Sequence, residues 1–247
     1  MLPFFRKIRY QLAKENQFLK YSRYAIGEIV LVVIGILIAL QINNWKQEIE
    51  SRTIEQNYLS ELKFNLISDS TAIHETLTFN EKKTAMVLEF MKIFDAELTN
   101  DQRFDIFETY SKPFTAYSVF KPKMTTWNNL LSSEKVSILK NVNLRNQLID
   151  YYSYDYSGGV QERIVIMNRK IIDENYQKFV TKQYVQKNFG MSTQFSDISN
   201  LSIHIDQEFF SNLYGISYII ILQNTFLEEL LQDIRTMLIL IDERLDN

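Results

Sequence analysis

Apolar residues run without a break from residue 29 to residue 40, and this run is the strongest feature of the hydrophobic pattern. Its twelve residues, IVLVVIGILIAL, include no charged or polar side chain. Tyr24 and Trp45 flank the run 21 positions apart. In a helix that separation is about 31 Å, close to the bilayer hydrocarbon thickness of about 30 Å. Aromatic rings at both ends are typical of membrane interfaces. The pattern predicts a transmembrane helix over residues 25–45, with a buried core helix as the weaker alternative.

Beyond the run, apolar residues recur at intervals of three, four or seven positions, the period of a helix with one buried face. The recurring residues are Leu59, Leu62, Leu66, Ile73 and Leu77. No glycine occurs between Gly35 and Gly158. We therefore expect the membrane helix to continue past Trp45 as a stalk into a helical bundle over residues 46–247.

Further helices are predicted along the bundle from periodicity and from capping residues. The spacing indicates helices over residues 86–94, 127–131, 144–152, 160–185 and 227–245, and a helix that begins at the capping box from Thr99 to Gln102. Phe179 is expected to face inward. Residues 112–124, which include Phe114 and Phe120, are interpreted as an ordered loop packed over the bundle, and residues 188–205 as a polar loop. The last helix carries an apolar stripe that requires a partner helix.

Composition agrees with an all-α fold class. The chain has 6 Gly and 3 Pro, too few for the many turns of sandwiches and barrels. With no cysteine it has no disulfide, thiolate nucleophile or Cys-ligated metal. The formal net charge of -3 argues against a nucleic-acid partner.

Basic residues are distributed unequally around the apolar run. Residues 1–24 contain six Lys and Arg, whereas residues 43–62 contain only Lys46 and Arg52. The positive-inside rule then predicts a basic cytoplasmic tail over residues 1–24 and places residues 46–247 across the bacterial inner membrane, in the periplasm. A cleaved signal peptide is disfavoured because no small-residue cleavage site follows the run.

The predicted anchor contains residues suited to helix association. Gly35 and Ala39 form a pair of small residues four positions apart, which lets two helix backbones approach closely, and Gly27 lies on nearly the same face. Glu28 lies near the cytoplasmic side, where it either reaches the headgroups or contacts another membrane helix. Together with Tyr24 and Trp45, these residues are the candidate site of membrane anchoring and of association between helices.

Candidate chemistry outside the anchor is sparse. His74 and His204 have no metal-ligand spacing, and no nucleophile elbow or phosphate-binding glycine motif occurs. Adjacent acids such as Glu228 and Glu229 are interpreted as a solvated helix face. The tyrosines Tyr151, Tyr152, Tyr154 and Tyr156 are interpreted as helix-end packing, with a stacking surface for glycan or peptide as the alternative. We expect no catalytic residue, metal or cofactor.

Two stretches near the N-terminus resemble a known family. The residues are FRKIR at 5–9 and KYSRYAIGEIVLVVIGILIALQINNW at 20–45. They resemble the signature of an uncharacterised family of single-span membrane proteins from Gram-negative bacteria, catalogued as a domain of unknown function. The resemblance is looser over residues 125–152 and faint over the last helix. It implies a membrane location and a helical exported part, and it supplies no activity.

The sequence predicts a membrane-anchored helical scaffold or protein-interaction module. Its expected partners are the bilayer and either another protein or a second copy, through the membrane helix or the C-terminal helix. A periplasmic ligand-sensing bundle that signals through a separate partner is the alternative, favoured by a continuous stalk and a polar pocket. A periplasmic hydrolase is a weaker one.

Overall fold

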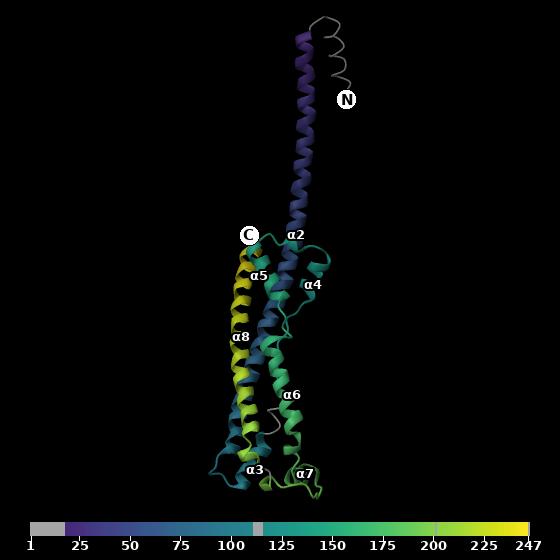
Figure 1. The fold of residues 1–247 in the computed structure, drawn as a ribbon. Coiled ribbons are helices and arrows are strands. Elements are labelled where there is room, and N and C mark those ends of the chain that lie inside the picture. The colour runs from purple at the N-terminus through teal and green to yellow at the C-terminus, as the bar shows by residue number, and fades with distance from the viewer. Residues whose placement is uncertain (1–17, 111–115, 201, 247) are drawn as a thin grey trace. The chain divides into compact units, whose positions relative to one another are not determined.

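The computed structural model describes residues 18–110, 116–200 and 202–246, and their regular structure is helical throughout (Figure 1). This confirms the all-α fold class. Most of the expected basic tail, residues 1–17, lies outside the described residues, as do Phe114 and the side chains of Tyr24 and Phe179. The chain divides into two compact units, residues 1–57 and residues 58–247.

The first long helix is α2, Phe18–Met91, a single helix of 74 residues. The expected continuation of the apolar helix is therefore confirmed. The prediction of a separate helix over residues 86–94 is wrong, because α2 reaches Met91 and the short 3-10 helix η1, Lys92–Phe94, follows. Three threonines lie within α2, and the hydroxyls of Thr53, Thr71 and Thr76 each donate to the carbonyl four residues earlier, at 3.0 Å.

In the first unit, the apolar side chains from Ile29 to Leu40 are exposed on every side of the helix, and Ile34 is 50% exposed. A helix that is apolar all round is normally covered by protein or by lipid. This helix is long and apolar enough to cross a membrane by length and composition.

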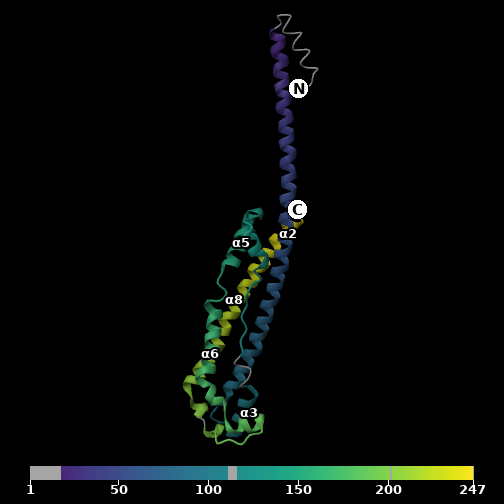
Figure 2. The ribbon, with the colours of Figure 1, turned by 90° about the vertical axis from the view of Figure 1, so that its right-hand side faces the viewer.

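The second unit is a bundle in which α2 and α8 lie side by side while α5 and α6 follow one another along a third side (Figures 1 and 2). After α2 the helices are α3 Asn100–Tyr110, α4 Thr125–Ser132, α5 Val142–Ser153, α6 Gly159–Phe179, α7 Lys182–Phe189 and α8 Gln207–Leu245. Short 3-10 helices are η3 Val136–Ile138, η4 Ile198–Asn200 and η5 Ser202–Ile205.

Side-chain caps set several helix boundaries. The predicted capping box is present before α3: the Thr99 amide donates to Gln102 Oε1 at 2.9 Å, and the Gln102 amide donates to Thr99 Oγ1 at 3.3 Å. Asn141 caps α5 and Asp206 caps α8 in the same manner, each accepting a hydrogen bond from an amide three residues later. These caps mark where a polar connection ends and the next helix begins.

Two predicted boundaries are wrong. The helix expected over residues 160–185 is divided into α6 and α7, because the buried Thr181 leaves the helical conformation and its hydroxyl caps α7 by accepting from the Tyr184 amide at 3.1 Å. The final helix begins at Gln207, before the expected start at Leu227, since the Asp206 cap starts it directly after the residues predicted as a polar loop.

The bundle has two apolar clusters, one toward each end. The first joins α2, α4, α5 and the second half of α8, and the second joins α2, α3, α6 and the first half of α8. The predicted stripe on α8 packs inside the chain, with Leu227, Ile234 and Ile241 almost fully buried. The loop prediction also holds where it is described: Phe120 is buried in the first cluster, between α2 and α8.

Candidate functional site

Residues 116–124 cross the bundle without helical structure, and polar side chains supply hydrogen bonds to their backbone. The buried Gln161 accepts from the Phe120 amide at 2.6 Å and donates to the Phe120 carbonyl at 3.0 Å. Gln223 donates to the Ser118 carbonyl at 3.0 Å. A buried backbone group without a partner is costly, so these contacts stabilise the segment where it lies.

The face of α2 toward this segment carries a row of buried polar residues, which we call the polar seam: Asn65, Asp69, Thr76, Asn80 and Lys83. Its spacings of four, seven, four and three keep it on one helix face. Along the seam, Asn65 donates to Thr126 Oγ1 at 2.9 Å, and Thr76 Oγ1 lies 3.1 Å from Ser118 Oγ. Asn80 donates to Gln223 Oε1 at 2.7 Å, which ties α2 to α8.

Lys83 is the buried cation of the seam and is 3% exposed. Its ammonium donates to the carbonyl oxygen of Ala116 and to Asn168 Oδ1 of α6. Both acceptors are neutral, so among the described residues it is dipoles that solvate the charge. Burial lowers the pKa of Lys83 to about 8, because desolvation disfavours the charged form.

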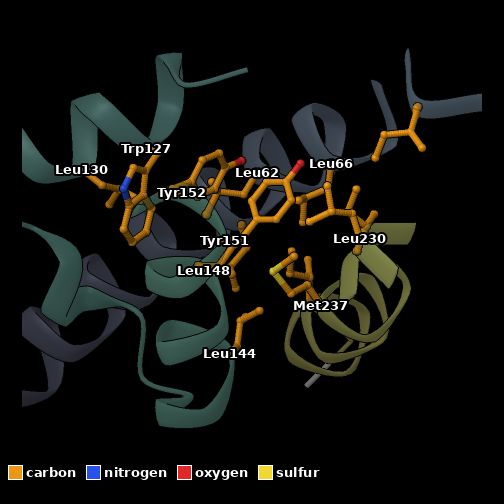
Figure 3. Close-up of a cluster of buried hydrophobic side chains, with 14 of the residues drawn as sticks. Leu62, Leu66, Trp127, Leu130, Leu144, Leu148, Tyr151, Tyr152, Leu230 and Met237 are labelled. Atoms are coloured by element: carbon orange, nitrogen blue, oxygen red, sulfur yellow. The ribbon is translucent and has the colours of Figure 1, made fainter. Parts of the chain in front are cut away.

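Asp69 connects the seam to the tyrosine cluster. Its two oxygens accept from the Lys123 amide at 2.9 Å and from the Tyr151 hydroxyl at 3.0 Å. Burial raises the pKa of Asp69, although these hydrogen bonds oppose the shift. Burial, and then the nearby charge of Asp69, raises the pKa values of Tyr151 and Tyr152. Tyr151 and Tyr152 lie within the first apolar cluster, where the Trp127 ring stacks on the Tyr152 ring at a centroid distance of 5.1 Å (Figure 3).

A pocket of about 430 Å³ lies on the other side of Tyr151, between α5, the turn after it, and α8. The lining residues are Gln147, Asp150, Tyr151, Tyr154, Tyr156, Phe226, Glu229, Leu230, Asp233, Thr236 and Met237. Its volume is in the range of small-ligand sites, about 300 to 1,000 Å³.

The aromatic wall of this pocket is held in place by contacts behind it. The Tyr154 ring lies 5.0 Å from Tyr156 and 5.4 Å from Phe226, centroid to centroid. The Tyr156 hydroxyl donates to the Tyr151 carbonyl at 2.9 Å, and Gln161 donates to the Tyr156 carbonyl at 2.8 Å. The pocket therefore has a wall positioned by the same network that holds residues 116–124.

The tyrosine cluster divides between packing and the pocket. Tyr151, Tyr152 and Tyr156 are buried, as the packing interpretation predicts. Tyr154 is 48% exposed and lines the pocket. Sequence reasoning did not find Glu229 and Asp233 as its companions. The signal was present, because Phe226, Glu229 and Asp233 follow at intervals of three and four and so lie on one face of α8.

The predicted anchor residues belong to the first unit's part of α2, whereas the residues that line the pocket belong to the second unit. A Cβ placed on Gly27 or Gly35 would meet nothing within 4 Å. Ala39 and Trp45 are exposed, and Glu28 is half-buried. Their predicted role in helix association stays a prediction.

The histidines do not form a site. His74 is exposed and His204 half-buried. Within the described ranges, no group of three or more His, Asp or Glu residues is arranged to hold a metal ion. Donors for a resident metal are therefore not gathered in this part of the chain.

Comparison with protein families shows the family of this chain. The model of a family of unknown function (DUF6090) matches residues 28–220, most of the chain. The chain belongs to this family. The match begins at Glu28, so FRKIR and the first residues of the longer signature precede it, while the apolar run and most of the bundle fall within it. No curated protein and no solved structure matches the chain.

Proposed function

We propose that this family member is a single-span protein of the bacterial inner membrane, with its N-terminus in the cytoplasm and its helical bundle in the periplasm. Support for the span comes from the exposed apolar side chains of residues 29–40. Support for the orientation comes from the six basic residues before the run against two after it. A reporter active only in the periplasm, fused after Asn247, should be active, and activity of a cytoplasm-only reporter there would reverse the orientation.

The proposed role of the bundle is binding rather than catalysis. The observation that carries it is the pocket beside Tyr154, which combines an aromatic wall with exposed carboxylates. A general acid commonly acquires its role through burial in an apolar site. Asp150, Glu229 and Asp233 are all solvent-exposed, which fits recognition better.

Of the two binding roles, ligand sensing is favoured over a pure scaffold by one specific contact. Tyr151 lines the pocket and its hydroxyl bonds to Asp69 of α2, so a molecule in the pocket would contact a side chain hydrogen-bonded to α2. A scaffold requires no such pocket. In this proposal the bundle passes its signal to a separate partner protein.

Site-specific photocrosslinking in living cells tests the binding role. A photoreactive amino acid replaces Tyr154 in the full-length protein, and in a matched control it replaces Tyr214, an exposed tyrosine on α8 outside the pocket lining. We expect adducts at position 154 above those at position 214, and their masses distinguish a small molecule from a protein. Equal or absent labelling at the two positions would remove the binding role.

A further inference from the structure

The pocket beside Tyr154 is acidic, and no basic side chain of the described residues lines it. Asp150 on α5 and Glu229 and Asp233 on α8 line it, and no lysine, arginine or histidine does. Within the described residues these three carboxylates have no ion-pair partner. Some other acids of the bundle do have such partners: Asp242 pairs with Lys63, Asp206 with Lys178 and Glu108 with Lys187. The pocket thus presents three carboxylates beside an aromatic wall.

The wall adds a second feature that attracts positive charge. Tyr154, Tyr156 and Phe226 form a connected group of rings, and the faces of aromatic rings attract cations. Tyr154 is accessible to solvent in the pocket, so a ligand can reach it. Carboxylates and accessible rings together are the chemistry that selects ammonium and guanidinium groups.

The same bundle already holds one ammonium group with this combination. Lys178 Nζ lies 2.5 Å from Asp206 Oδ2 and 5.4 Å from the centroid of the Phe209 ring. There the cation is a lysine side chain of the protein itself. Beside Tyr154 the lining has carboxylates and aromatic rings, and it includes no basic side chain of the described residues.

The remaining lining residues indicate what carries the charge. Leu230 lines the pocket and keeps 8% of its surface exposed, although it belongs to the first apolar cluster. An aliphatic chain can lie against Leu230 while its charged end meets the carboxylates. The volume of about 430 Å³ accommodates a short chain of this kind.

We infer that the pocket between α5 and α8 binds an organic cation, an ammonium or guanidinium group on a short aliphatic chain. This inference rests on the proposed binding function and names the ligand class of the same site. The cation is either a free small molecule or the end of a lysine or arginine side chain in a peptide. Binding is 1:1 and weakens with salt, because exposed charges are screened.

Calorimetric titration of the full-length protein in detergent tests the inference with two matched probes. The probes are 1,5-diaminopentane and the neutral 1,5-pentanediol, and a lysine-rich peptide forms a second arm. We expect the diamine or the peptide to bind and the diol not to bind. Binding of the diamine identifies a free small cation as a sufficient ligand, and binding of the peptide alone identifies a side chain. Equal binding of diamine and diol, or no binding of diamine and peptide, overturns the inference.

Variants locate the binding in the pocket. Glu229→Gln with Asp233→Asn should weaken binding roughly fivefold or more, since each exposed pair contributes up to about a factor of five. Tyr154→Ala should weaken it about threefold, the loss of one exposed cation–π contact. Glu228→Gln removes a charge from α8 outside the lining and should leave binding nearly unchanged. If Glu228→Gln weakens binding as much as the pocket variants, the cation site is not here.

The two proposals fail in different ways. If crosslinking at position 154 yields adducts but neither diamine nor peptide binds, the binding role stands and the cation class falls. If a cation binds but the pocket variants do not weaken it, the site assignment falls. Absence of both adducts and cation binding removes both proposals.

Discussion

Residues 29–40 and residues 59–90 belong to the same helix, α2, yet their side chains have different surroundings. In the first stretch Ile34 is half-exposed and every neighbouring apolar side chain is exposed as well. In the second, Leu66 is fully buried and apolar positions recur with the helical period. Secondary structure is therefore not what distinguishes the two stretches. The arrangement of apolar residues around the helix is what sets the medium that each requires.

The second difference between the stretches is polar. The run from 29 to 40 has no side-chain hydrogen-bonding group, whereas the second stretch contains the polar seam. Rotation of a uniformly apolar helix about its axis costs little free energy, because it breaks no side-chain hydrogen bond. Rotation of the second stretch would separate Asn80 from Gln223 and Asp69 from Tyr151, and would leave buried polar groups without partners. The seam thus gives the second stretch a fixed orientation in the bundle.

The largest expected effect comes from truncating matched apolar residues in the two stretches. Leu66→Ala should lower the free energy of unfolding of the bundle by about 2 to 5 kcal/mol, typical of a fully buried leucine. Ile34→Ala should change it by less than about 0.5 kcal/mol, since Ile34 belongs to the first unit and its side chain is 50% exposed. Urea unfolding of the full-length protein in detergent, followed by near-ultraviolet circular dichroism, measures both. Similar losses in the two variants would erase the contrast between the stretches.

Trp127 supplies a second readout for this experiment. It stacks on Tyr152 next to Leu130, whereas Trp45 is exposed in the first unit. In a Trp45→Phe background, fluorescence then reports the bundle alone. Agreement between fluorescence and dichroism midpoints would show that the bundle unfolds as one cooperative unit.

The helices themselves could largely be predicted from the sequence. The run at 29–40, the leucines of α2, the capping box at Thr99 and the stripe on α8 are local patterns, and local patterns carry helix type and helix position. The boundary at Thr181 was missed, because a threonine cap inside an apolar-periodic stretch resembles an ordinary helical threonine. The early start of α8 was missed because residues 207–226 expose several apolar side chains, among them Tyr214, Tyr218 and Ile221.

The candidate site was less predictable because it depends on contacts between distant residues. Tyr154 and its neighbours were recognised as a cluster, but their partners come from α8, more than seventy positions away. The polar seam had a readable spacing. What the spacing does not show is that residues 116–124, a loop by composition, lie across the seam and bond to it. Packing of a loop against a helix leaves no period in the sequence.

A charge added within the first stretch, compared with a charge removed just before it, tests the predicted span. Ile34→Arg should impair membrane insertion, because a central charge costs about 2.5 to 3.5 kcal/mol on translocon scales. Glu28→Ala should leave insertion intact, since the twelve apolar residues and Trp45 remain. The carbonate-resistant membrane fraction of each variant measures insertion. Normal insertion of both variants would mean that the span is not formed by residues 29–40.

The smallest expected effect concerns Lys83, the charge that the second stretch already carries. Burial lowers the pKa of Lys83 to about 8 in the folded chain, against the ordinary lysine value of 10.5. Between these values the unfolded chain binds more protons than the folded chain, so the free energy of unfolding rises with pH there. Below the folded pKa both states are protonated and the full penalty of the buried charge persists.

The rise should amount to about 2 kcal/mol between about pH 7 and about pH 9.5. Higher pH reverses it, because burial raises the pKa values of Tyr151 and Tyr152 and the folded chain then binds more protons than the unfolded chain. Lys83→Met should abolish the rise, whatever it costs in absolute stability through the lost bonds to Ala116 and Asn168. Lys82→Met, a change at an exposed neighbour, should retain it. Urea unfolding of the three proteins across this pH range measures the rise in each. A rise of the same size in Lys83→Met would show that the pH dependence does not come from the Lys83 ammonium.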